Sequence, residues 1–269
     1  MAHTRPVAIL LAGSAATGEV DCFADLDLLC YYEAMPPEAR FRAARERWRG
    51  ATGVRHDPWN EVGIGEVCAI DGVEVQVGHF LVGAVERDIA AVTEVFSTDA
   101  VLHKKILGLV EGRALHGEAV IARWQGRLAE YPDGLAWAMV EQHLRGIFPV
   151  WYYREHLARR DAELWWRQAL VEGALHILGV LAGLNRRYFS AMQLKRTRAL
   201  VAAMPIAPAQ IVGRLEQLLS VDVVEATERI EGIVREVLEL VVRWMPEANI
   251  AVMLRQPGER EKRWEVPRA

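Results

Sequence analysis

The periodicity of apolar residues changes near residue 115, and this change constrains the fold more than any other feature of the chain. Before it, short β-branched or alternating runs, which are typical of strands, interleave with segments of helical period. After it, the pattern is almost wholly helical, with apolar residues recurring at three- and four-residue spacing. Because 269 residues are long for a single core, we expect two domains.

The first part of the chain is expected to form an α/β layer with a small mixed sheet. Its β-branched or alternating runs predict strands over residues 7–13, 25–32, 65–70 and 73–80. Helical patterns predict helices over residues 36–50 and 82–96. Asp71-Gly72 suits a tight turn with positive φ, so the last two strands are predicted to form a hairpin.

The second part is expected to form an all-α bundle. Its helical patterns cover residues 118–131, 135–160, 162–189, 208–219 and 223–245. The segment 161–188 is apolar on most sides, which predicts a central helix, and the last helix is amphipathic enough to serve a homodimer or the bundle itself. The predicted class is therefore α+β, with an α/β core over 1–115, a helical bundle over 116–255 and a polar tail over 256–269.

Composition and charge argue against several classes of protein, with nucleic acid an unexpected partner. With 52% apolar and 25% charged residues the chain is typical of soluble globular proteins, and a net charge of −4 provides no basic field for nucleic acid. Three cysteines without a CxxC pair indicate neither a disulfide framework nor a zinc site, so we expect a reducing, cytoplasmic location. The most apolar later stretch, 173–184, is shorter than the about 20 residues that a bilayer requires.

The segment AGSAATGEVDCFADLDLL carries the clearest chemical signal. A predicted strand ends in Gly13-Ser14, where the missing Cβ of Gly13 lets the backbone approach a ligand closely. Residues 15–18 can then turn as a short helix or nest, whose N–H groups favour a phosphate. The hydroxyl of Ser14 adds a donor for a terminal phosphate oxygen.

Asp25 and Asp27 follow eleven and thirteen residues after Ser14, on the next predicted strand. Successive strand side chains point to opposite faces, so the two carboxylates are expected to share one face while Leu26 and Leu28 point into the core. Neighbouring carboxylates repel each other unless a cation lies between them. Mg²⁺ prefers such ligands together with substrate phosphates, so the pattern predicts a magnesium–nucleotide site.

Gly-Ser, a ten-residue gap and Asp-x-Asp on a strand together resemble the signature of the polymerase-β-like nucleotidyltransferase superfamily. The helical remainder is similar to its small-molecule branch, which includes the kanamycin, lincosamide and streptomycin nucleotidyltransferases. The resemblance implies transfer of a nucleoside monophosphate from Mg-NTP, with ATP the expected nucleotide, to a hydroxyl of a small molecule. It also implies two Mg²⁺ ions held by Asp25 and Asp27, with Gly13 and Ser14 at the β- and γ-phosphates. The segment with Asn185, Arg186, Arg187, Tyr188 and Lys195 is similar to one that recurs in the helical domains of that branch. The resemblance implies nucleotide contacts from Arg186, Arg187, Tyr188 and Lys195.

The chain departs from this family where a third carboxylate is usual, because Gln76 stands at the aligned position and an amide cannot accept a proton from a hydroxyl. Glu74 lies two residues earlier on the same strand face, about 6–7 Å away by strand rise, and is one candidate base. A second possibility is a base from the helical part. Its candidates are Glu141, Glu155, Glu163 and Glu172. A third is a nucleotide-binding or antitoxin-like partner module that transfers nothing.

Other chemically capable side chains have structural alternatives. Glu172 and His176 share a helix face, as a core pair or as a catalytic one. The cations Arg186, Arg187 and Lys195 suit either a solvated helix end or a triphosphate. Histidines without ligand partners at metal spacing are taken as structural or surface residues, namely His79, His103 and His143. An aromatic cluster suits core filling or a cleft for a ring substrate, and consists of Trp151, Tyr152, Tyr153, Trp165 and Trp166.

Overall fold

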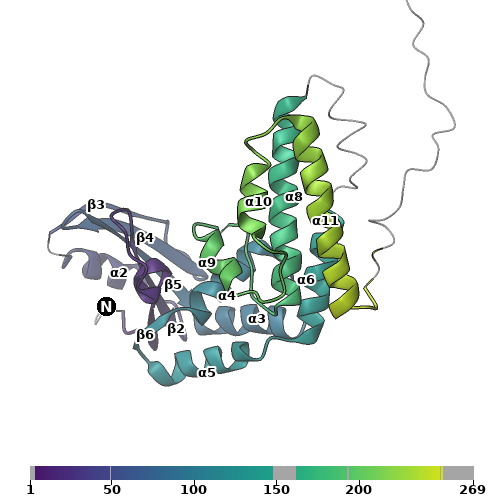
Figure 1. Cartoon of the computed structure of the whole chain (residues 1–269). Helices are drawn as coiled ribbons and strands as arrows, with labels where there is room; N and C mark the ends of the chain where they lie inside the picture. Colours follow the sequence, from purple (N-terminus) through teal and green to yellow (C-terminus); the bar gives the residue numbers. More distant parts are fainter. Residues whose placement is uncertain (1–3, 49, 148–161, 193, 249, 251–269) are drawn as a thin grey trace, which may run out of the picture. The chain divides into compact units, whose positions relative to one another are not determined.

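The chain has an α+β fold, as predicted. A computed structural model describes residues 4–48, 50–147, 162–192, 194–248 and 250, and the predicted polar tail lies outside these ranges. The chain divides into two compact units, Met1–Leu135 with Tyr188–Met192, and Ala136–Arg187 with Gln193–Ala269 (Figure 1). The first unit holds the sheet and extends past residue 115, the end of the predicted core, to include the helix that follows.

A six-stranded mixed sheet forms the centre of the first unit (Figure 1). Its strands are β1 Ala8–Ala12, β2 Leu26–Tyr32, β3 Ala51–His56, β4 Gly63–Ile70, β5 Val73–Leu81 and β6 Arg113–His116. Their order is β3-β4-β5-β2-β1-β6. Only β2 and β5 pair in parallel among these neighbours, and the other pairs are antiparallel. The predicted hairpin joins β4 to β5, with φ of 51° at Asp71 and 82° at Gly72, as a tight turn of this kind requires.

One face of the sheet is covered by α2, Glu38–Arg45. The ring of Phe41 lies edge-on to Tyr32 of β2, with centroids 6.2 Å apart. Under it is a core of buried side chains that β2, β4 and β5 contribute, namely Cys30, Tyr32, Cys68, Val75 and Val77. The helix ends at Arg45, five residues before the predicted end, because the N–H groups of Arg47 and Trp48 bond three residues back and tighten the chain into a turn.

The other face is covered by α3 Val82–Thr93, α4 Ala100–Val110 and α5 Glu118–Ala129. Tyr31 of β2 packs edge-on against Trp124 of α5, with ring centroids 5.0 Å apart. Tyr188 also belongs to this unit, since it is buried and its hydroxyl donates to the main-chain oxygen of Leu128 at 3.2 Å. Helix α4 and the strands β3 and β6 are not among the elements that the sequence pattern predicts.

The second unit is helical, as predicted. Its helices are α8 Glu163–Leu184, α9 Thr197–Ala202, α10 Ile211–Gln217 and α11 Val223–Trp244, and α6, Asp133–Gly146, enters it from the first unit. All residues of α8 from Ile177 to Leu184 are buried, which confirms the prediction of a central helix for this part of α8. Its first half has exposed side chains, such as Leu164 and Val171. It lies beside α11 (Figure 1), whose first turn is capped by Asp222. No helix within the described ranges is long and apolar enough to cross a membrane.

Helices α6 and α8 approach each other closely through two glycines. A Cβ at Gly179 of α8 would lie 2.4 Å from the ring of His143, and one at Gly146 of α6 would lie 2.2 Å from the ring of His176. The two rings are hydrogen-bonded through their Nδ1 atoms at 3.0 Å. Each histidine therefore packs over the glycine of the opposite helix.

Candidate functional site

Four polar side chains lie together on the two parallel strands at the centre of the sheet. Asp27 of β2 stands opposite Gln76 of β5 in the strand register. Asp25 directly precedes β2, and Glu74 lies two residues before Gln76. Because side chains alternate along a strand, all four share one face, the face that α3, α4 and α5 cover further along. Here, however, Asp25, Asp27 and Gln76 are half-buried and Glu74 is exposed.

The side chains on the other face of β2, Leu26 and Leu28, were predicted to point into the core, and only one of them does. Leu28 packs against the core under α2, as expected. Leu26 does not, since 36% of it is exposed. The reason is its position, because Leu26 is the first residue of β2 and lies beyond the core cluster, whose β2 members start at Leu28.

Gly13 makes room for the carboxylate of Asp27. The two residues are neighbours because β1 ends at Ala12, which pairs with Asp27 in the register. Gly13 has a φ of 65°, and a Cβ built on it would lie 2.3 Å from Asp27 Oδ2. Two features therefore require glycine at this position, namely its backbone conformation and this close approach. The sequence analysis expected a ligand to use this space, and the Asp27 carboxylate occupies it.

The chain turns directly after Gly13. Gly13–Thr17 form the short helix α1, which ends at Gly18 in the left-handed conformation. The main-chain oxygen of Ser14 accepts bonds from the Thr17 hydroxyl at 3.2 Å and the Glu19 N–H at 3.1 Å, which fix this turn. Ser14 itself is half-buried and α1 contacts β2, so Ser14 lies at the same end of the sheet as the carboxylates.

Gln76 bridges two of the acidic side chains. Its amide nitrogen donates to Asp25 Oδ2 and to Glu74 Oε1, both at 2.9 Å. Ionised carboxylates only accept hydrogen bonds, so the NH₂ end of the amide must face them. The bridge reduces the repulsion between Asp25 and Glu74, which parallel strands would otherwise place side by side.

The site fits a divalent cation that arrives with additional oxygen ligands. Asp25 and Asp27 supply two carboxylates, which are hard ligands of the kind that Mg²⁺ takes together with substrate phosphates. Within the described part of the chain, no group of three or more His, Cys, Asp or Glu side chains is placed to hold a metal ion. A cation held here would therefore need phosphate oxygens or water to complete its coordination.

The residues of the 185–195 segment are divided between the two units. Arg186, Arg187 and Lys195 are exposed on the second unit. Asn185 ends α8, where its side chain donates to the main-chain oxygens of Leu181 and Ile206 and accepts from the Ile206 N–H, and these bonds account for it structurally.

Tyr188, by contrast, lies in the core of the first unit. Its ring packs against Tyr131, with centroids 4.9 Å apart, and burial raises its pKa to about 12. Its packing and its hydroxyl bond to Leu128 account for it structurally, and its predicted contact with a nucleotide stays a prediction.

The alternative bases of the helical part make local contacts on their own helices. Glu141 pairs with Arg145 and Glu163 with Arg167, each at i,i+4. Glu172 accepts from Gln168 at 2.8 Å. Glu155 lies outside the described residues.

His176 has a histidine as its hydrogen-bond partner, not the glutamate with which the sequence analysis grouped it. Burial lowers its pKa, while the nearby Glu172 raises it in part. Of the aromatic cluster, Trp166 is fully buried and Trp165 is 46% exposed. The remaining members, Trp151, Tyr152 and Tyr153, lie outside the described residues.

A second polar cluster, which the sequence analysis missed, is buried on the α2 face of the sheet. Glu66 accepts from Arg45 at 2.5 Å and bonds His79 Nε2 at 3.0 Å. The Nδ1 of His79 bonds the Tyr32 hydroxyl at 2.9 Å, and this hydroxyl lies 3.1 Å from the hydroxyl of Thr4. Burial raises the pKa of Glu66, but its bonds to His79 and Arg45 outweigh this effect and bring the pKa below its usual value. His79 is thus structural, as expected.

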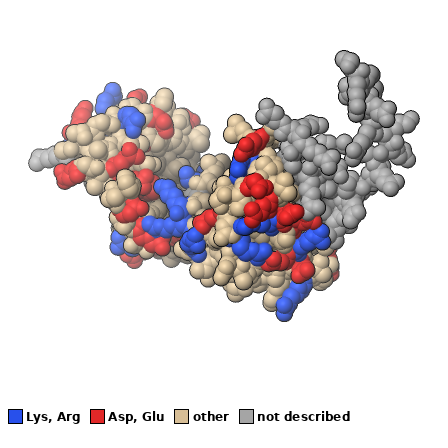
Figure 2. Space-filling view, turned by 45° about the horizontal axis from the view of Figure 1, so that its top comes forward, with Lys and Arg blue, Asp and Glu red and all other residues tan. Residues whose placement is uncertain are grey.

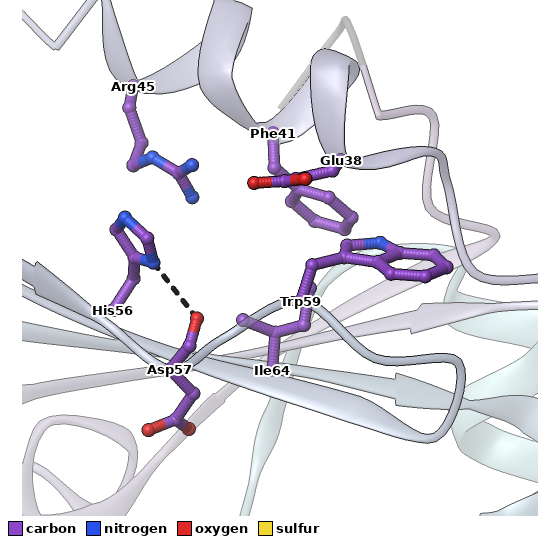
Figure 3. Close-up of a pocket in the computed structure, with 7 residues that line it drawn as sticks. All are labelled: Glu38, Phe41, Arg45, His56, Asp57, Trp59 and Ile64. Carbon is purple, nitrogen blue, oxygen red and sulfur yellow. Dashed lines mark hydrogen bonds between the residues drawn. The ribbon is translucent and has the colours of Figure 1, made fainter.

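A hollow opens beside this cluster (Figure 3). In it the Arg45 guanidinium and the His56 ring face each other, and the Asp57 carboxylate points away to accept from the Gly65 N–H at 2.9 Å. Its lining residues are Glu38, Phe41, Arg45, His56, Asp57, Trp59 and Ile64. Because it lies on the α2 face, the sheet separates it from Asp25 and Asp27. On the surface that Figure 2 draws, acidic and basic side chains are interspersed within each unit.

Comparison with known proteins finds similar chains among solved structures. No protein-family model matches the sequence, and no curated protein matches it either. Among solved structures, the chain is similar to the crystal structure of a nucleotidyltransferase-like protein from Exiguobacterium sibiricum 255-15. The TM-score is 0.36 and the identity 12%, over 91% of this chain and 75% of the other.

Proposed function

We propose that the chain is a nucleotidyltransferase that moves a nucleoside monophosphate from Mg-NTP, ATP in the first instance, to a hydroxyl of a small molecule. One observation carries the proposal: the Asp27 carboxylate packs into the space that Gly13 leaves open. This contact joins the Gly13-Ser14 turn and the carboxylates into one site at one end of the sheet. Neighbouring carboxylates beside the turn at Gly13-Ser14 suit a nucleotide whose phosphates are accompanied by a cation.

The reaction requires little covalent chemistry from the protein. The acceptor oxygen attacks the α-phosphorus, the bond from that phosphorus to the bridging oxygen of the β-phosphate breaks, and pyrophosphate leaves. When bound, Mg²⁺ would neutralise the charge on the phosphates. Asp25 and Asp27 would hold it, and Ser14 would donate its hydroxyl to a terminal phosphate oxygen. Gly13 keeps Asp27 in place.

Glu74 is the proposed base. Its carboxylate is exposed on the same face as Asp25, and the bond from Gln76 orients one of its oxygens. The other oxygen would accept the proton of the acceptor hydroxyl. The nucleotide contacts of Arg186, Arg187 and Lys195 stay predictions from the sequence.

Asn substitutions at the carboxylates test this function. The assay follows pyrophosphate release and transfer of label from α-labelled ATP, with Mg²⁺ and a panel of small hydroxyl acceptors. Asp25→Asn and Asp27→Asn should abolish both signals, since each keeps the side-chain shape and removes the charge. Asp71→Asn is the matched control, because Asn also suits the β4–β5 turn. Turnover that survives in both site variants would contradict the proposal.

A second candidate function is nucleotide binding without transfer, as in a partner-binding module. The bond from Gln76 to Glu74 favours it, because a hydrogen bond to a carboxylate stabilises the charged form and makes it a weaker base. The two candidates differ in one result. A binding module would bind Mg-ATP in an Asp25-dependent manner and release no pyrophosphate with any acceptor.

A further inference from the structure

The amide of Gln76 lies between two carboxylates, those of Asp25 and Glu74. Both of its N–H groups are used, one on Asp25 and one on Glu74, each at 2.9 Å. An NH₂ group has only two such donors, so no donor remains for a third partner. The bridge holds the two side chains in one arrangement. It adds no charge, so the negative charge of the site is unchanged.

We propose that Gln76 is a positioning residue that acts as a clasp on the carboxylates and keeps the affinity of the protein for a bare divalent cation low. The inference rests on the proposed function and deepens it, since it makes cation binding depend on the nucleotide. The clasp consists of Gln76, Asp25 and Glu74.

The physical reason for the low affinity is competition between the Gln76 amide and the cation for Asp25. A cation at Asp25 Oδ2 competes with the amide hydrogen of Gln76 for the negative charge of that oxygen. The cation then has two carboxylate ligands, Asp25 and Asp27, and the described residues place no third ligand of this kind beside them. A triphosphate would supply additional charged oxygens and make the exchange favourable. Glutamate at position 76 would have the opposite effect, because it has nearly the same shape but turns the donor into a third charged ligand.

The test is a titration of Mn²⁺ without nucleotide, followed by electron paramagnetic resonance of the free ion. Gln76→Glu should bind Mn²⁺ at least about tenfold more tightly than the wild type, which corresponds to about 1.4 kcal/mol. Adding Asp25→Asn to this variant should cancel most of the gain. The charge-matched control is Gln168→Glu on α8, where the amide also donates to a glutamate, Glu172, at 2.8 Å. This control should bind Mn²⁺ like the wild type.

Thermal unfolding gives a second readout that does not require the glutamate variant to fold. Gln76→Leu removes both N–H bonds without adding charge, so its melting temperature should lie below that of the wild type. On addition of Mn²⁺ its melting temperature should rise by more than that of the wild type. A residue with a purely structural role would lower the melting temperature by the same amount with and without Mn²⁺. That result, or equal Mn²⁺ affinity of Gln76→Glu and the wild type, would overturn the clasp.

Failure of the clasp and failure of the proposed function give different results. If Mg-ATP binding requires Asp25 but Mn²⁺ affinity is indifferent to residue 76, the clasp is wrong and the function stands. If Asp25→Asn binds Mg-ATP as well as the wild type, the function is wrong, and the clasp falls with it.

Discussion

Gly13→Ala separates the backbone role of Gly13 from the space that it leaves for Asp27. A residue with a side chain at the φ of 65° found here costs about 1–2 kcal/mol. In a domain of this size this corresponds to a fall in melting temperature of about 2–8 °C. The new Cβ would also lie 2.3 Å from Asp27 Oδ2, whereas ordinary contacts begin at 3.4 Å, so the carboxylate must move by about 1 Å (3.4 − 2.3). Misplacement of a ligand by this distance reduces activity about 100-fold.

Gly53→Ala is the matched control. Gly53 has almost the same φ, 62°, and a Cβ there meets no atom within 4 Å. Both variants should therefore lose similar stability in thermal melts. Equilibrium dialysis with labelled ATP and Mg²⁺ should find binding intact in Gly53→Ala and lost in Gly13→Ala. If Gly13→Ala binds as tightly as its control, the packing of Asp27 against Gly13 has no part in nucleotide binding.

Three further predictions concern stability. Glu66→Gln removes the charge that binds the half-buried Arg45 and the buried His79. Urea denaturation should detect a loss of about 3 kcal/mol, and an unchanged midpoint would contradict this. Burial lowers the pKa of His176, so the folded protein favours the neutral ring. The contribution of this ring to folding stability is fully present above the unfolded pKa of about 6.5 and is lost as the pH falls below that value. His176→Phe should flatten the curve of stability against pH there, and an unaltered slope would refute this. Gly179→Ala should destabilise the fold by about 1–3 kcal/mol, because the new Cβ overpacks the contact between α6 and α8. Gly232→Ala, whose Cβ would meet nothing within 4 Å, should stabilise it by about 0.5–1 kcal/mol. Denaturation that ranks the two variants in reverse would disprove the α6–α8 packing.

The strands with strong alternation were predictable, because their pattern needs only local sequence. The runs that became β1, β2, β4 and β5 and the Asp71-Gly72 turn follow from residue type alone. The edge strands β3 and β6 were missed because both are mostly exposed. In addition, β6 has only four residues and β3 has an irregular register near Gly53. A signal for α4 was present, because Asp99 caps it by accepting from the Leu102 N–H.

Within the site, the shared face of Asp25 and Asp27 follows from the two-residue period of a strand. The parallel pairing of β2 with β5 does not, because strand order depends on contacts distant in sequence. That pairing sets Gln76 beside Asp25, so the bridge could not be predicted. The contact of Asp27 with Gly13 depends on the same sheet.

The most direct test of the account is a calorimetric titration of a non-hydrolysable ATP analogue with Mg²⁺ into the wild type and into a variant that combines Asp25→Asn and Asp27→Asn. The account predicts metal-dependent binding by the wild type and none by the double variant, with Asp71→Asn indistinguishable from the wild type. Binding of equal strength by the double variant, or binding that is the same with and without Mg²⁺, would contradict it.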